Sequence, residues 1–232
     1  MGSKERRARE KALVHGRILD AAQALFTRHG YEAVTMRRIA EQVEYTPTAL
    51  YFHFQNKEAL LQELSERSAL ALGVEFGKLR SVKDPLERVR RMGKAYIQFA
   101  LAHPYEYRLL FMTPHPALSS EPSAVARGNL SGDAYALLVQ TIAEAITASL
   151  LRPELRDAEQ VAQVFWSGVH GFVSLILVRR NDPWIHWRPV APTGQLVIET
   201  LVTGLTAPTA SANTLLSRKS AGPRSRPTKT PR

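Results

Sequence analysis

The chain has 232 residues, a net charge of +10 and 44% hydrophobic residues, enough apolar material for one large domain or for two smaller ones. It contains no cysteine, which excludes disulfide bonds and thiolate metal sites. Residues 206–232 carry six Lys or Arg and no Asp or Glu, so much of the excess positive charge lies at this end. The net charge of the chain is therefore weak evidence for a specific nucleic-acid site.

The N-terminal sequence, MGSKERRAREKALVHG, is charged and lacks the apolar segment of a signal peptide. We find no run of about 18 apolar residues, the length that a membrane-spanning helix needs. Together with the lack of cysteine, these features predict a cytoplasmic protein without a membrane partner.

Residues 15–29 are predicted to form a helix, because their apolar side chains recur with helical spacing. These side chains are Ile18, Ala21, Ala22, Leu25 and Phe26. Arg28 and His29 then lie in the last turn, where cations suit the helix dipole, and Gly30 follows at the natural C′ position. The helix is therefore expected to end at residue 29.

Two short helices follow, and each is marked by its first residues. Thr35 is a good N-cap for a helix over 36–43, with Val34 and Ile39 spaced to form a hydrophobic staple. Thr46 is an N-cap and Pro47 occupies the first position of a helix over 47–54. Two short helices joined by residues 44–46, after a longer supporting helix, have the layout of a helix-turn-helix module.

The rest of the chain is also helical in pattern. Asn56 is expected to cap a long helix that ends near residue 80, and the apolar spacing predicts further helices over 86–102, 105–112, 123–151, 157–180 and 193–206. A Pro/Ser-rich loop covers 113–122, and strand alternation is absent. The predicted fold class is all-α with about nine helices: a three-helix domain over 15–61, a larger helical domain over 62–206 and a disordered basic tail over 207–232.

The helix predicted over 47–54 divides into an inner and an outer side. At 100° per residue, Leu50 and Phe54 fall on one side and are predicted to be buried. The outward side chains are those of Thr48, Ala49 and Phe52, and the flanking ones are those of Tyr51 and His53. Small or hydroxylated residues near the start of such a helix would let it approach the major groove of DNA closely.

The segment TMRRIAEQVEYTPTALYFHFQNKEALL, from Thr35 to Leu61, resembles the DNA-binding signature of the TetR family of transcriptional regulators. The resemblance implies phosphate contacts by Thr35 and by Arg37 or Arg38, an approach to the bases by Thr46, Pro47, Thr48 and Ala49, and backbone contacts by Tyr51, His53 and Lys57. Phe52 is left open between packing on a thymine methyl and plain exposure. Where the family usually has glycine in the turn, this chain has Glu44, and a left-handed residue other than glycine costs about 1 kcal/mol.

Both ends of the chain allow two interpretations. The basic segment 1–14 is either an arm that reaches a neighbouring groove or a solvated tail; its cations are Lys4, Arg6, Arg7, Arg9 and Lys11. The tail over 207–232 either adds salt-sensitive, nonspecific attraction to DNA or only solubilises the protein.

A weaker resemblance covers the C-terminal part. FWSGVHGFVSL, from Phe165 to Leu175, resembles the W-x-x-x-H-G segment of one TetR C-terminal class, and HPYEYRLLF, from His103 to Phe111, resembles the helix before it. In the family the last two helices form a dimer interface and the middle helices enclose an effector cavity. Candidate lining residues are Met92, Tyr96, Phe99, Tyr107, Phe111, Phe165, Trp166 and His170, each of which also suits ordinary core packing. For Trp166 and His170, packing with hydrogen-bond partners is the favoured interpretation.

The resemblance implies a homodimeric, ligand-responsive DNA-binding regulator, most simply a repressor that leaves a pseudo-palindromic operator when an effector binds. The effector and the operator stay open. We expect no cofactor, metal or catalytic residue, because the sequence has no Gly-x-Ser-x-Gly elbow, phosphate-binding glycine loop or His-Glu-x-x-His pair. The rival functions are an enzyme and a helical adaptor that uses its first three helices for protein contact.

Overall fold

The computed structural model describes residues 2–113, 128 and 132–207. In these residues the chain forms nine α-helices and one 3₁₀ turn, which confirms the all-α prediction. The helices are α1 (Ser3–His29), α2 (Met36–Gln42), α3 (Pro47–Tyr51), α4 (Lys57–Gly77), α5 (Pro85–Ala102), α6 (Pro104–Met112), α7 (Ala134–Thr147), α8 (Ala158–Arg179) and α9 (Val190–Leu205). The predicted loop, except residue 113, and the predicted tail, except residue 207, lie outside the described residues.

Several predicted helix bounds were wrong, among them the start of α9, which is Val190 rather than residue 193. Helix α1 begins at Ser3 rather than near residue 15, so most of the predicted basic arm belongs to this helix. Its first turns are exposed, and the strong helix propensity of their Lys, Glu, Arg and Ala residues accounts for the helix without apolar periodicity. Helix α3 ends at Tyr51, and α7 ends at Thr147 because Ser149 adopts a left-handed conformation with φ 55°.

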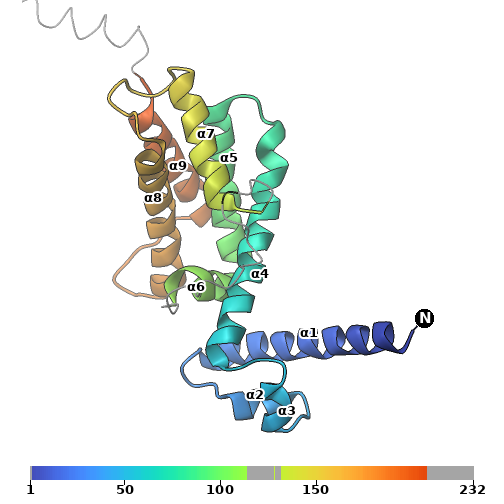
Figure 1. Cartoon of the computed structure of the whole chain (residues 1–232). Coiled ribbons are helices and arrows are strands. Elements are labelled where there is room, and N and C mark those ends of the chain that lie inside the picture. The colour runs from blue at the N-terminus through green and yellow to red at the C-terminus, as the bar shows by residue number, and fades with distance from the viewer. Residues whose placement is uncertain (1, 114–127, 129–131, 208–232) are drawn as a thin grey trace, which may run out of the picture.

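The described helices pack around two separate hydrophobic cores. The first joins α1, α2, α3 and the start of α4, and its last α4 member is Leu64. The second begins at Leu72 and joins the rest of α4 to α5, α6, α7, α8 and α9. Figure 1 shows α4 rising from the small group of α1, α2 and α3 into the larger helical bundle, so this helix belongs to both parts.

Helix α6 lies where the two cores meet. Leu109 belongs to the first core, whereas Tyr107, two residues earlier, is fully buried in the second. Gln23 of α1 donates a hydrogen bond of 2.7 Å to Glu106 of α6. One short helix is therefore bonded to the first part of the molecule and packed into the second.

Helix α8 has the length and apolar composition of a membrane-crossing helix. In this fold it packs against α7 and α9, and it contributes Phe165, Val169 and Val173 to the second core. Core helices of soluble proteins pass the same test of length and composition, so one such helix is weak evidence for a membrane-crossing segment.

The turn between α2 and α3 has the geometry that glycine favours. Glu44 has φ 61°, its N–H donates to the carbonyl of Glu41, and the N–H of Tyr45 donates to the carbonyl of Ala40. This pair of bonds is a Schellman motif with Glu44 at the C′ position, where glycine is the usual residue. The strain expected from the sequence is therefore present in the fold.

Replacing Glu44 by glycine should stabilise the protein. Glycine adopts a positive φ without a Cβ clash, so we expect the free energy of unfolding to rise by about 1 kcal/mol. Glu44→Ala is the matched control, because it removes the carboxylate but keeps the Cβ. Urea denaturation of both variants distinguishes backbone strain from charge, and equal gains in the two would show that strain is not the cause.

Candidate nucleic-acid interface and internal cavity

The short helices α2 and α3 are held by the caps that the sequence predicts. The Thr35 hydroxyl accepts from the Arg38 N–H at 3.3 Å, and the Thr46 hydroxyl accepts from the Ala49 N–H at 3.1 Å. Pro47 occupies the first position of α3. These caps satisfy N–H groups that a helix start leaves free, and they hold both N-termini at the molecular surface.

Helix α3 is anchored on one side and open on the other. Leu50 is 0% and Phe54 4% exposed, whereas Phe52 is 81% and Tyr51 51% exposed. This confirms the predicted inner and outer sides. Thr46, Pro47 and Thr48 are also exposed, and Ala49 is half-buried. The first turn of α3 therefore presents small side chains to solvent.

The arginines at the start of α2 lie beside this surface and have exposed partners. Arg37 pairs with Glu41 at 3.0 Å, and the Arg38 guanidinium lies 2.8 Å from Nε2 of His29. The charge of Arg38, after desolvation, helps to lower the pKa of His29. Exposed pairs of this kind contribute little stability, so both arginines can exchange partners for phosphate at small cost.

Lys57 has a structural contact in addition to its predicted role. Its Nζ donates to the Tyr31 carbonyl at 3.1 Å and lies 4.1 Å from the centre of the Tyr31 ring. The start of α4 is thereby bonded to the link between α1 and α2. A substitution of Lys57 would loosen this link as well as remove a surface charge.

His53 lies on the other flank, against α1. Its Nδ1 is buried without a hydrogen-bond partner among the described residues. Desolvation, and then the charges of His15 and Lys11, lower its pKa, so the ring is neutral at pH 7. A neutral ring can still donate an N–H from Nε2, but it brings no positive charge to a phosphate. His53 and Phe52 share a shallow groove with Arg7 and Lys11 of α1.

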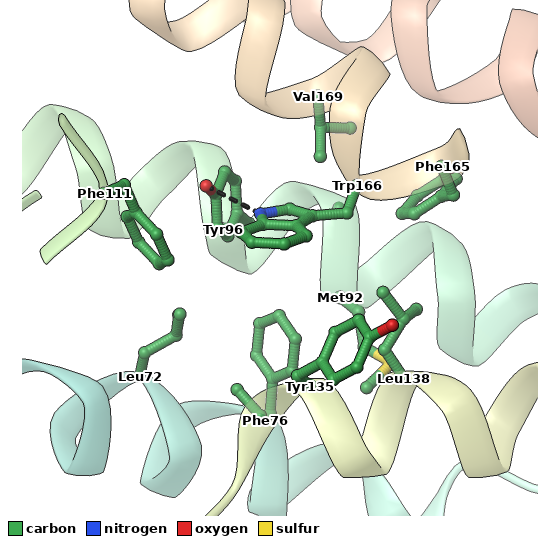
Figure 2. A pocket seen from close by; sticks show the side chains of 12 residues that line it. Leu72, Phe76, Met92, Tyr96, Phe111, Tyr135, Leu138, Phe165, Trp166 and Val169 are labelled. Atoms are coloured by element: carbon green, nitrogen blue, oxygen red, sulfur yellow. Dashed lines mark hydrogen bonds between the residues drawn. The ribbon is translucent and has the colours of Figure 1, made fainter. Parts of the chain in front are cut away.

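The larger domain contains a partly open cavity of about 110 Å³ between α4, α5, α6, α7 and α8 (Figure 2). Its lining residues are Leu72, Phe76, Met92, Gly93, Tyr96, Phe111, Ala134, Tyr135, Leu138, Phe165, Trp166 and Val169. Carbon atoms form nearly the whole of its surface.

Five of the eight candidates from the sequence line this cavity and three do not. Phe99 is buried in the second core and its ring lies 5.2 Å from that of His103. Tyr107 and His170 do not line the cavity but form hydrogen bonds with the Tyr96 hydroxyl. The lining residues that the sequence did not reveal are Leu72, Phe76, Gly93, Ala134, Tyr135, Leu138 and Val169. Apolar periodicity marks them as inward-facing but does not distinguish a cavity wall from packed core.

A chain of hydrogen bonds runs along one side of the cavity. Trp166 Nε1 donates to the Tyr96 hydroxyl at 3.0 Å, and that hydroxyl lies 3.0 Å from the Tyr107 hydroxyl. The Tyr107 hydroxyl lies 2.6 Å from Nδ1 of His170, and Nε2 of His170 lies 3.1 Å from the Ser174 hydroxyl. A neutral His170 with its proton on Nε2 is consistent with each of these four contacts.

Burial tunes the ionisation of these groups. It raises the pKa of Tyr96 and of Tyr107 and lowers the pKa of His170, so all three are neutral near pH 7. Trp166 and His170 therefore have hydrogen-bond partners in the packed domain, as the favoured interpretation supposed, and Trp166 also lines the cavity.

The lowered pKa of His170 predicts a loss of stability in mild acid. Unfolded histidine binds a proton near pH 6.5, whereas folded His170 does so only at lower pH, so the free energy of unfolding should fall as the pH drops below about 6.5. His29 and His53 act in the same direction. His170→Gln should reduce this slope by up to about 1.4 kcal/mol per pH unit. Urea denaturation between pH 7 and pH 5 measures it, and an unchanged slope would contradict the assignment.

Comparison with known proteins agrees with both parts of this architecture. Residues 18–64 match the family model described as bacterial regulatory proteins of the tetR family, and residues 89–185 match the model of the tetracyclin repressor-like C-terminal domain. The transcriptional repressor KstR2 of Mycobacterium tuberculosis is 26% identical over 188 residues, which cover 79% of this chain and 84% of that protein.

Solved structures show the same fold. That of KstR2 from M. tuberculosis has a TM-score of 0.58 at 22% identity and covers 84% of this chain and 95% of that one. A protein from Rhodococcus sp. RHA1 has a TM-score of 0.66 at 23% identity, with 83% and 95% coverage. AibR, solved with isovaleryl coenzyme A and operator DNA, has a TM-score of 0.57 at 24% identity, with 84% and 98% coverage. The chain belongs to the TetR family of helix-turn-helix, DNA-binding transcriptional regulators.

Proposed function

We propose that this chain is a cytoplasmic transcriptional repressor that leaves its operator when a small molecule occupies the cavity. The observation that carries the proposal is the position of α6. Phe111 of this helix lines the cavity, whereas Leu109 packs in the first core and Glu106 is bonded to Gln23 of α1. A ligand that displaces Phe111 would therefore act on the helix that supports the DNA-binding part.

The DNA-binding surface is proposed to consist of the exposed side of α3 with the N-terminus of α2. Its residues are Thr35, Arg37, Arg38, Thr46, Pro47, Thr48, Ala49, Tyr51, Phe52, His53 and Lys57. Free first-turn N–H groups and arginines favour phosphate, and the lean first turn of α3 suits the major groove. Arg7, Glu10 and Lys11 border the groove beside Phe52, and the two cations extend this surface along α1.

The chain is proposed to act as a homodimer through α8 and α9. Val164, Leu175 and Val178 are exposed and fall on one side of α8, and Leu196 is exposed on α9. A side chain added at Gly171 would meet nothing within 4 Å, so a second helix can approach closely there. A two-fold dimer would place two α3 helices in major grooves about 34–36 Å apart, or a multiple of that distance.

Repression is the simplest mode because a dimer on an operator blocks the DNA that it covers, and KstR2, which is similar over most of this chain, is named a repressor. Activation would be recognised by increased transcription when the protein is bound. Neither rival function has support in three relatives, which are named as two repressors and one activator of transcription.

The test is a footprint of the full-length chain on the DNA upstream of its own reading frame. Tyr51→Ala should weaken binding to the protected site by about 10-fold or more, because it removes a contact at the edge of the groove. Tyr105→Ala is the matched control, since Tyr105 is a similarly exposed tyrosine on α6. Lys57 is avoided because its substitution would also disturb Tyr31. No protected site, or equal binding by both variants, would contradict the proposed surface.

A further inference from the structure

We infer that the cavity takes an uncharged ligand with one ring-sized apolar group. This deepens the proposed function, because the occupant would be the effector of the repressor. It disfavours one class of compound that the fold alone leaves open, namely ionised acids whose charge would lie inside the cavity.

The wall is aromatic and carries no charge. Six of its twelve residues have aromatic rings, namely Phe76, Tyr96, Phe111, Tyr135, Phe165 and Trp166, and none is Asp, Glu, Lys or Arg. Figure 2 shows these rings on opposite sides of the space, with the Trp166 indole along one side and Phe76 and Tyr135 along the other. Stacked and edge-on contacts with such rings favour a flat apolar group.

The polar atoms at the wall already have partners. Trp166 Nε1 donates to the Tyr96 hydroxyl, which is itself bonded to Tyr107 and His170. The Tyr135 hydroxyl accepts from Gln163. A carboxylate or phosphate in the cavity would lose its hydration without gaining a cation, and this loss costs several kcal/mol. A charged group inside the cavity is therefore disfavoured, because the wall offers no cation to compensate it.

The volume sets the size of the group. A cavity of about 150 Å³ lined by apolar side chains holds benzene. The present cavity, about 110 Å³, is slightly smaller, and a single ring fits after small movements of the wall. Ala134 and Gly93 line it without bulky side chains, so its size depends on these positions.

The test compares toluene with benzoate, two single-ring probes that differ in charge. Binding to the full-length chain without DNA is measured by titration calorimetry at pH 7 and by the fluorescence of Trp166, with Trp166→Phe identifying the signal from the cavity. We expect saturable binding of toluene and at least about 100-fold weaker binding of benzoate. Equal or tighter binding of benzoate overturns the inference, and so does the failure of toluene to bind.

A matched pair of variants locates the site. Ala134→Phe fills the cavity and should weaken toluene binding by at least about 10-fold, whereas Ala143→Phe places the same side chain on the opposite side of α7 and should leave it unchanged. Thermal denaturation shows whether each variant folds, and Leu138→Phe repeats the test at a second lining residue. If Ala134→Phe and Leu138→Phe both bind toluene as the native chain does, toluene binds elsewhere and the inference is overturned.

This result is independent of the operator experiment. Toluene binding is measured without DNA, and the footprint is measured without ligand. Operator binding without toluene binding would contradict the proposed ligand class but not the proposed repressor function. Toluene binding without a protected DNA site would contradict the repressor function but not the ligand class.

Discussion

Leu50→Ala is expected to lower the free energy of unfolding of the DNA-binding part by about 2–5 kcal/mol. Leu50 is fully buried and is the main contact of the five-residue helix α3 with the first core. Removing it leaves a cavity below a helix that is too short to persist by itself. Hydrogen exchange of the amides in α1, α2 and α3 should rise far more than that in the second core.

Phe52→Ala is the matched control on the same turn of chain. Its ring is 81% exposed, so we expect stability to change by no more than about 0.5 kcal/mol. Similar losses in the two variants would contradict the division of this segment into an anchor and a surface. The operator affinity of Phe52→Ala, compared with that of the native chain, also shows whether this ring contacts DNA.

Thr48→Glu is expected to weaken operator binding by at least about 100-fold. Thr48 is exposed in the first turn of α3, where the proposed surface meets the bases, and a carboxylate there would face the phosphates of both strands. Like charges placed against each other cost several kcal/mol. Because the position is exposed, the free energy of unfolding should stay within about 0.5 kcal/mol. Fluorescence anisotropy with labelled operator at one fixed salt concentration measures the affinity.

Thr48→Lys separates affinity from specificity. The added cation should keep or strengthen binding to unrelated DNA and make it more salt-dependent, while the preference for the operator falls. If both variants bind the operator as the native chain does, Thr48 does not approach the bases. If Thr48→Glu and Thr48→Lys both lose binding to all DNA, the substitutions have changed the structure of α3 and not only its charge.

Local signals in the sequence predicted most of the DNA-binding part. Thr35, Thr46 and Asn56 are side-chain caps, and each accepts the hydrogen bond that its position predicts. The buried Leu50 and the exposed Thr48 of α3 followed from the rotation per residue of a helix. The same rotation gave the correct exposure of Phe52 and burial of Phe54, which lie beyond the end of α3. Caps and periodicity depend on neighbours within a few residues, which is why they can be read without the rest of the fold.

The remaining features depend on contacts distant in sequence or on propensity without burial. The first turns of α1 carry no apolar stripe, so periodicity placed its start too late. Lys57 meets Tyr31 only because the link before α2 folds against α4. Gly93 and Ala134 become cavity residues only when five helices are assembled, and no local pattern distinguishes them from packed positions.

Helix α4 crosses from one core to the other as one continuous rod. Its 21 residues span about 30 Å. A rod of that length turns a tilt of about 5° at one end into a displacement of roughly 2.6 Å at the other. A small change in the second core that tilts α4 would therefore move the first core by a larger distance. That displacement is most of the spacing between two base pairs of DNA.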